Sequence, residues 1–147
     1  TGVLFAFYSA VAALFSLLIP RIAKKISRKK TYSFSLLLGG IGLASMYFVH
    51  DKTILLVSIS GVGLAWAAIL AMPYTMLSGS LPADKMGVYM GLFNATITIP
   101  QIAAGLLGST IIALFGGFPM AIIVIAGASM LIAGLAVFFV KEKTASN

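Results

Sequence analysis

Five long stretches of the sequence contain no charged side chain, and this feature restricts the fold more than any other. They cover residues 3–20, 32–49, 53–81, 88–115 and 118–140, and the last two are separated by the short connection Gly116–Gly117. A helix needs roughly 20 predominantly apolar residues to cross a bilayer, and each stretch is close to that length or longer. Backbone groups find no partners in lipid outside helices and closed barrels. The sequence therefore predicts an all-α fold, a polytopic membrane helix bundle with five transmembrane helices.

The composition excludes a soluble domain and several classes of chemistry. Of the 147 residues, 61% are hydrophobic and only 9% are charged, whereas soluble domains carry about 25% charged residues. The chain has no cysteine, which excludes disulfides, cysteine-ligated metals and thiol nucleophiles. No zinc-protease, serine-hydrolase or phosphate-loop motif is present. We therefore expect a protein that is not an enzyme and that holds no cofactor or metal.

Basic residues are concentrated on alternate connections between the predicted spans. The first connection (21–30), the third connection (82–87) and the C-terminal tail hold nine of the ten: Arg21, Lys24, Lys25, Arg28, Lys29, Lys30, Lys85, Lys141 and Lys143. The opposite side holds Lys52. Because basic loops favour the cytoplasm, we expect an inner-membrane protein with a cytoplasmic C-terminus and a cytoplasmic basic first loop. This loop lies between two spans, which favours the lipid bilayer as its partner and argues against nucleic acid.

One predicted span carries a polar stripe. Asn94, Thr98 and Gln101 are spaced four and three residues apart, so they share one face of a helix. An amide without a partner in hydrocarbon costs several kcal/mol, so this face must meet protein or water. One interpretation is an interhelical hydrogen bond worth about 0.6–2 kcal/mol. The other is a cavity lining that binds a polar solute, since polar residues inside a membrane often mark a pathway.

Aromatic residues and prolines add to this candidate site. Trp66 lies in the middle of its span, where it could pack in the core, face lipid or form a stacking platform for a sugar ring. Tyr74 and Tyr8 supply hydroxyl groups that need partners. Pro73 and Pro100 each remove one helical hydrogen bond, which predicts either static curvature or a flexing point for gating.

Two blocks of sequence resemble the C-terminal half of a major facilitator superfamily transporter, and more narrowly the bacterial sugar:proton symporters related to sucrose and maltose carriers. The family's eighth transmembrane helix is similar to GVLFAFYSAVAALFSLLIP (Gly2–Pro20). Its helices ten and eleven are similar to GVGLAWAAILAMPYTMLSGSLPADKMGVYMGLFNATITIPQI (Gly61–Ile102). By this resemblance, residues 1–147 form a C-terminal transmembrane domain fragment with a partial major facilitator fold, helices eight to twelve.

The basic connection resembles the superfamily's short cytoplasmic motif in its weaker C-terminal copy. The positions that match or nearly match are Ala23, Lys25, Arg28 and Lys29. Pro20, Lys24 and Ser27 stand where the motif has its first glycine, its aspartate and its second glycine. The missing acid argues against a charge relay in this copy and leaves a basic clamp at the cytoplasmic face.

The resemblance implies a function that the residues alone do not. It implies secondary active transport of a sugar with a proton by alternating access, with helices eight, ten and eleven lining the cavity. No Asp, Glu, Lys, Arg or His lies inside any predicted span. The proton-coupling carboxylates are therefore expected in a missing N-terminal half of the same transporter, and the start at Thr1, without a Met, is expected to reflect a longer chain.

Two further hypotheses remain open at this stage. The first is a major facilitator transporter of another solute, such as a drug exporter. It is favoured by four methionines near the proline kink at Pro73: Met72, Met76, Met86 and Met90. The second is a scaffold subunit that transports nothing and uses its polar residues to join helices. Fold resemblance alone does not separate these functions.

Overall fold

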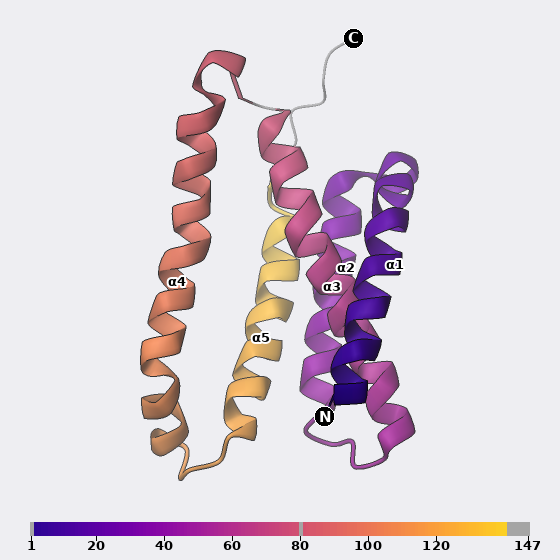
Figure 1. Cartoon of the computed structure of the whole chain (residues 1–147), viewed down its shortest axis with the longest axis vertical. Helices are drawn as coiled ribbons and strands as arrows, with labels where there is room; N and C mark the ends of the chain where they lie inside the picture. Colours follow the sequence, from indigo (N-terminus) through magenta and orange to yellow (C-terminus); the bar gives the residue numbers. More distant parts are fainter. Residues whose placement is uncertain (1, 80, 141–147) are drawn as a thin grey trace.

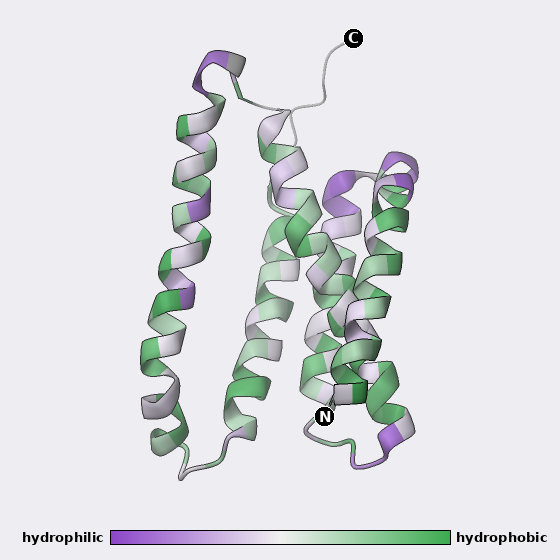
Figure 2. Cartoon of the chain, viewed as in Figure 1, coloured by the Kyte–Doolittle hydropathy of each residue, from purple (hydrophilic) through white to green (hydrophobic). Residues whose placement is uncertain are grey.

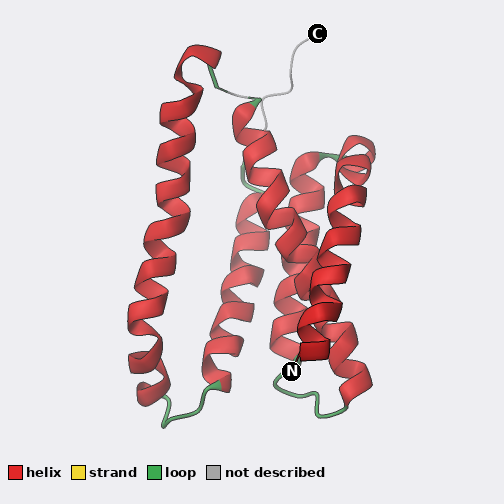
Figure 3. Ribbon diagram, viewed as in Figure 1, coloured by secondary structure: helices red, strands yellow, loops and turns green. Residues whose placement is uncertain are grey.

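The computed structural model describes residues 2–79 and 81–140, and it is helical nearly throughout (Figures 1 and 3). The elements in order are α1 (Gly2–Ile26), α2 (Arg28–Ser45), α3 (Lys52–Ser78), the short 3-10 helix η1 (Ala83–Lys85), α4 (Met86–Leu114) and α5 (Met120–Val137). The described residues contain no strand. The prediction of an all-α membrane bundle is therefore confirmed.

Four of the five α-helices are long and apolar enough to cross a membrane, namely α1, α3, α4 and α5. The exception is α2, because three of its 18 residues are the cations Arg28, Lys29 and Lys30. Its apolar part begins at Thr31 and extends past the helix end through a turn at residues 46–48. By length and composition, four described helices therefore qualify as membrane spans.

The basic segment differs from the loop that the charge pattern predicted. α1 continues through Pro20 to Ile26, and α2 begins at Arg28, so Ser27 alone is not helical between them. Lysine, arginine and alanine favour helices, and cations in the last turn of α1 complement the partial negative charge of its end. Ser27 has a φ of 144°, which is rare for a residue with a side chain. Its hydroxyl accepts a hydrogen bond from the backbone N–H of Lys30 at 3.3 Å.

The centre of the bundle is α2, which packs against α3 on one side and α5 on the other. Small residues allow this packing: a Cβ added to Gly40 would lie 2.9 Å from the carbonyl oxygen of Gly127, and one added to Gly61 would lie 2.8 Å from that of Leu38. Hydroxyl groups of α2 bond across both contacts, and toward α3 the Ser45 and Ser58 hydroxyls share a hydrogen bond of 2.8 Å. The Ser33 hydroxyl donates to the carbonyl oxygen of Gly134 at 2.5 Å in α5. Interhelical hydrogen bonds and close backbones are the usual glue of membrane bundles.

A second contact joins α1 to α3. Its buried apolar cluster consists of Ile19, Ala23, Ala67, Ala68 and Met72. Most of these side chains are small, so the two helices approach closely near the C-terminal end of α1, which the charge pattern predicts to be cytoplasmic. Met72 is only 3% exposed and therefore belongs to this core.

In contrast, α4 has no buried residue and lies beside α5 at the margin of the bundle (Figure 1). A Cβ added to any of four α4 glycines would meet nothing within 4 Å: Gly87, Gly91, Gly105 and Gly108. Figure 2 shows hydrophilic bands within α4, whereas α5 has none along its length. α4 is therefore the only described α-helix without a buried residue, and it carries the side-chain amides of Asn94 and Gln101.

The turns follow local signals in the sequence. Gly116 and Gly117, between α4 and α5, have φ values of +69° and +79°, which glycine adopts without strain. Asp51 caps α3, and its carboxylate accepts from the backbone N–H groups of Thr53 at 2.7 Å and Ile54 at 3.2 Å. These two bonds lower the pKa of the Asp51 carboxyl, chiefly through Thr53.

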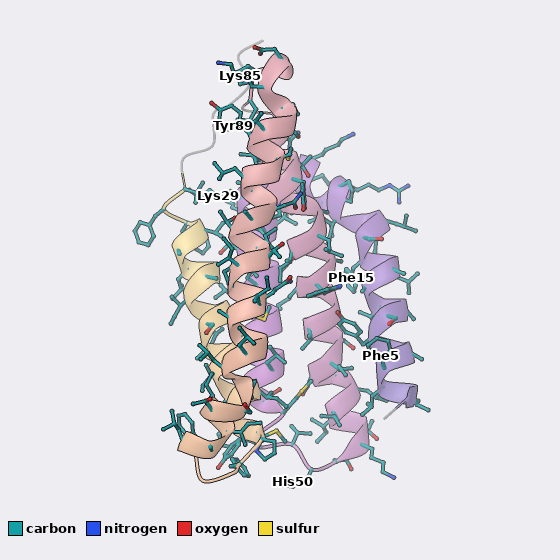
Figure 4. The ribbon with its side chains drawn as sticks, turned by 60° about the vertical axis from the view of Figure 1, so that its left-hand side comes forward. Phe5, Phe15, Lys29, His50, Lys85 and Tyr89 are labelled. Atoms are coloured by element: carbon teal, nitrogen blue, oxygen red, sulfur yellow. The ribbon has the colours of Figure 1, made fainter. Side chains whose placement is uncertain are left out.

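Alternate connections lie at opposite ends of the bundle, as the charge pattern requires. Figure 4 shows Lys29 and Lys85 near one end and His50 near the other. The tail lysines, Lys141 and Lys143, fall outside the described residues.

Candidate functional site

An open groove of about 750 Å³ runs between α1 and α3. Its lining consists of Phe5, Tyr8, Ser9, Ala12, Ala13, Ser16, Trp66, Ala67, Leu70 and Ala71. Trp66 forms one wall from α3, and its side chain is 44% exposed although it lies at mid-helix. Tyr8 faces it from α1, with its ring centroid 5.9 Å from that of Phe5. The groove thus joins Trp66 and Tyr8, two of the site residues that the sequence predicted.

The groove combines flat apolar surfaces with a few hydroxyl groups. Alanines at the lining positions of α1 leave space that larger side chains would fill. Ser9 and Ser16 are seven residues apart and therefore lie on the same face of α1. The Ser16 hydroxyl donates to the carbonyl oxygen of Ala13 at 2.7 Å, which leaves its lone pairs open to the groove. Such a surface suits a ligand with both C–H faces and hydroxyl groups.

A second junction connects α3 to α4. The Tyr74 hydroxyl donates a hydrogen bond to the side-chain oxygen Oδ1 of Asn94. The ring of Tyr74 also meets Phe93 edge-on, with centroids 5.2 Å apart and an interplanar angle of 82°. The structure therefore pairs two predicted site residues with each other, so the Asn94 amide oxygen has a protein partner.

The remainder of the polar stripe lies on the same face of α4 but has no partner in the described bundle. Thr98 and Gln101 are exposed, and within the described ranges neither side chain forms a hydrogen bond. Thr96, on another face of α4, donates to the carbonyl oxygen of its own helix at Phe93, 2.7 Å away. Gln101 is thus an uncharged amide at membrane depth whose donors and acceptor are not used by this bundle.

The two prolines lie inside helices that continue through them. Pro73 precedes Tyr74 in α3, and Pro100 precedes Gln101 in α4. Side chains supply extra hydrogen bonds in the last turns of α3, where the Thr75 hydroxyl donates to the carbonyl oxygen of Ala71. The role of the prolines in gating stays a prediction.

Sequence reasoning missed two contacts of this region. Arg28 donates from Nη1 to the carbonyl oxygen of Thr75 at 3.3 Å, so the start of α2 is tied to the end of α3. Phe93 packs on Tyr74. Its position directly before Asn94 was the sequence feature that could have predicted this contact. The described residues contain no group of three His, Cys, Asp or Glu side chains that could hold a metal ion.

Four apolar helices of spanning length, with polar side chains exposed at mid-helix, define an integral membrane protein. The model for the Major Facilitator Superfamily matches residues 1–147, so the chain belongs to this superfamily of membrane solute transporters. Searches of curated proteins and of solved structures found no significant match. The resemblance to this superfamily is thereby confirmed at the level of the family.

Proposed function

We propose that this chain is the C-terminal half of a sugar:proton symporter, in which α1, α3 and α4 contribute one wall of the solute cavity. The observation that carries the proposal is the exposed amide of Gln101 on a helix that crosses the membrane. Lipid offers no partner for this amide, and its exclusion from water costs several kcal/mol when it is unpaired. A water-filled cavity that receives a polar solute supplies the amide with water and with a hydrogen-bonding partner.

The groove supports a sugar as the solute class. An indole such as Trp66 has a flat apolar face that matches the C–H face of a pyranose ring. Hydroxyl groups from Tyr8 and Ser9 lie on the opposite wall, where they can exchange hydrogen bonds with ring hydroxyls. The groove has the size of ordinary small-ligand sites, which measure about 300–1,000 Å³.

Proton coupling requires a group that the described helices lack. Proton relays in membranes are built from Asp, Glu or His, and the described membrane spans contain none. We propose that an N-terminal half supplies this group and closes the cavity from the other side. The two halves then rock around a site near the midplane, as secondary transporters do, with the cytoplasmic face at the end that carries Lys29 and Lys85.

The test is uptake of radiolabelled sucrose and maltose by proteoliposomes that contain the full-length protein. Gln101→Ala removes the free amide, and the loss of one hydrogen bond predicts about a tenfold lower uptake efficiency. Trp66→Ala should raise KM, and Trp66→Phe should restore part of the affinity. Thr96→Val is the matched control, because the Thr96 hydroxyl bonds only to its own helix in the described structure. Unchanged uptake by Gln101→Ala at normal expression would falsify the cavity assignment.

A drug exporter is the second candidate, and the mostly apolar lining of the groove favours it, with Phe5 and Leu70 beside Trp66. The methionines are a weaker argument than the sequence indicated, because Met72 is buried in the core. A substrate screen separates the candidates: transport of hydrophobic cations without any saccharide identifies an exporter. No flux of any solute from the complete protein supports a scaffold.

A further inference from the structure

The break between α1 and α2 gathers an unusual density of positive charge. Within ten residues the chain carries six cations, and five of them are exposed: Arg21, Lys24, Lys25, Arg28 and Lys30. The helices on both sides of Ser27 hold these side chains on an ordered turn. Arg28 also bonds to the Thr75 carbonyl, so the turn is fastened to the end of α3. We call the four exposed cations other than Arg28, namely Arg21, Lys24, Lys25 and Lys30, the basic elbow.

The basic elbow has no acidic partner in the described part of the chain. Asp51 caps α3 at the opposite end of the bundle, and Asp84 belongs to η1 beyond the end of α3. None of the four cations forms an ion pair with either carboxylate among the described residues. Among the described residues, the elbow therefore presents a concentrated positive charge with no carboxylate paired to it.

The elbow lies at the depth of lipid headgroups. The apolar part of α1, from Gly2 to Pro20, has a length of about 28 Å at 1.5 Å per residue, close to the hydrocarbon thickness of roughly 30 Å. Arg21 follows directly, so the cations emerge where the hydrocarbon ends. Ile26 is 58% exposed among them and offers an apolar side chain beside the charges. Lysine and arginine at this depth extend their stems along lipid and their charges toward phosphates.

We propose that the basic elbow binds the phosphate headgroup of an anionic phospholipid from the leaflet at this end of the bundle. The charge selects the headgroup, and the exposed Ile26 contacts the upper part of an acyl chain. Because Arg28 fastens the elbow to the end of α3, a bound lipid braces the α1–α2 turn against the helix that carries Tyr74. This lipid site is separate from the solute groove, whose lining residues end at Ser16 on α1.

The experiment measures retention of phosphatidylglycerol by the full-length protein in detergent, using native mass spectrometry, with phosphatidylcholine and inorganic phosphate as the other probes. A cation near an anionic surface contributes about a fivefold change in binding. We expect Lys24→Gln to weaken phosphatidylglycerol retention about fivefold, and the pair Lys24→Gln with Lys25→Gln about 25-fold. The matched control is Lys52→Gln, an exposed lysine at the opposite end, which should change nothing.

Charge also sets the orientation of the protein, so the test includes a check of topology. Lys24→Arg with Lys25→Arg keeps the charge and should keep both retention and orientation. Accessibility of a His50→Cys label reports the orientation of each variant. If the glutamine variants invert or fail to insert, retention of phosphatidylglycerol by the unaltered protein is measured at increasing salt concentration. Salt must weaken this retention, and retention that does not change with salt overturns the proposal. Equal retention of phosphatidylcholine, equal binding of inorganic phosphate, or an equal loss in Lys52→Gln overturns the proposal.

Discussion

The Tyr74–Asn94 hydrogen bond connects α4 to a bundle in which α4 buries no residue, so its removal should have a measurable effect. Tyr74→Phe deletes the hydroxyl and preserves the ring that packs on Phe93. Asn94→Ala deletes the acceptor. Hydrogen bonds between membrane helices contribute about 0.6–2 kcal/mol, and we expect a loss of about 1 kcal/mol for each single variant. The retained ring contact, worth about 0.5–1.5 kcal/mol, keeps the phenylalanine variant from losing more.

The assay is a double-mutant cycle on reversible unfolding in mixed micelles of detergent and sodium dodecyl sulfate. The coupling energy between the two positions should equal most of the single losses, about 1 kcal/mol, because the two groups act as one interaction. Thr96→Val serves as the control partner for Tyr74→Phe, since Thr96 bonds within α4. Distances between spin labels on α3 and α4 should also become more widely distributed when the bond is absent.

One result refutes the reasoning directly. Independent sites add to within about 0.3–0.5 kcal/mol, so a coupling energy below that range means that Tyr74 and Asn94 do not hold α4. In that case the two side chains face the solute independently. A coupling between Tyr74 and Thr96 as large as that between Tyr74 and Asn94 leads to the same conclusion.

Three further predictions concern stability. In Gly61→Ala, the new carbon lies 2.8 Å from the Leu38 oxygen, whereas ordinary contact begins at 3.4 Å, so α2 and α3 must separate and the free energy of unfolding should fall by about 1–3 kcal/mol. In Gly105→Ala, the new carbon meets nothing within 4 Å, so the free energy of unfolding should stay the same or rise by up to about 1 kcal/mol. Unfolding titrations that rank the two variants equally contradict this packing. Ser33→Ala removes the buried bond to Gly134 and should cost about 1 kcal/mol in the same assay, whereas an unchanged midpoint shows that the bond adds nothing. The pKa of Asp51 is lowered in the folded chain, chiefly by the N–H of Thr53, so its contribution to stability is complete above the ordinary carboxyl pKa and is lost as the pH falls through the lowered value. Asp51→Asn should keep the cap and remove this acid sensitivity. A variant that retains the full acid sensitivity argues against Asp51 as its source.

The sequence predicted the helices because apolar length is a local property. It also predicted the turn at Gly116 and Gly117, where both residues adopt the positive φ that glycine allows. It failed at residues 21–30, where charge was interpreted as a loop although lysine and arginine favour helices. Only Ser27 leaves the helical conformation there, and no composition rule identifies one such residue.

The candidate site was predicted as a face and not as a set of contacts. Helical spacing placed Asn94, Thr98 and Gln101 together on α4. It could not show that Asn94 bonds to Tyr74 twenty residues earlier, because that depends on how α3 and α4 align. The groove that joins Trp66 to Tyr8 was likewise not visible, since a groove arises from the distance between α1 and α3. Periodicity reveals which side chains share a direction, and packing determines what they meet.

The glycine contacts of α2 have a consequence for motion. At Gly61 and Gly127 the nearest atoms of the facing helix α2 belong to its backbone, so backbone packs on backbone there and few side-chain rotamers can rearrange. We therefore expect α2, α3 and α5 to move as one rigid body with slow amide hydrogen exchange. Any change of shape during transport must then be absorbed at the margins, where α4 is attached by few contacts. The stiffest part of the molecule thereby determines which helix is free to move.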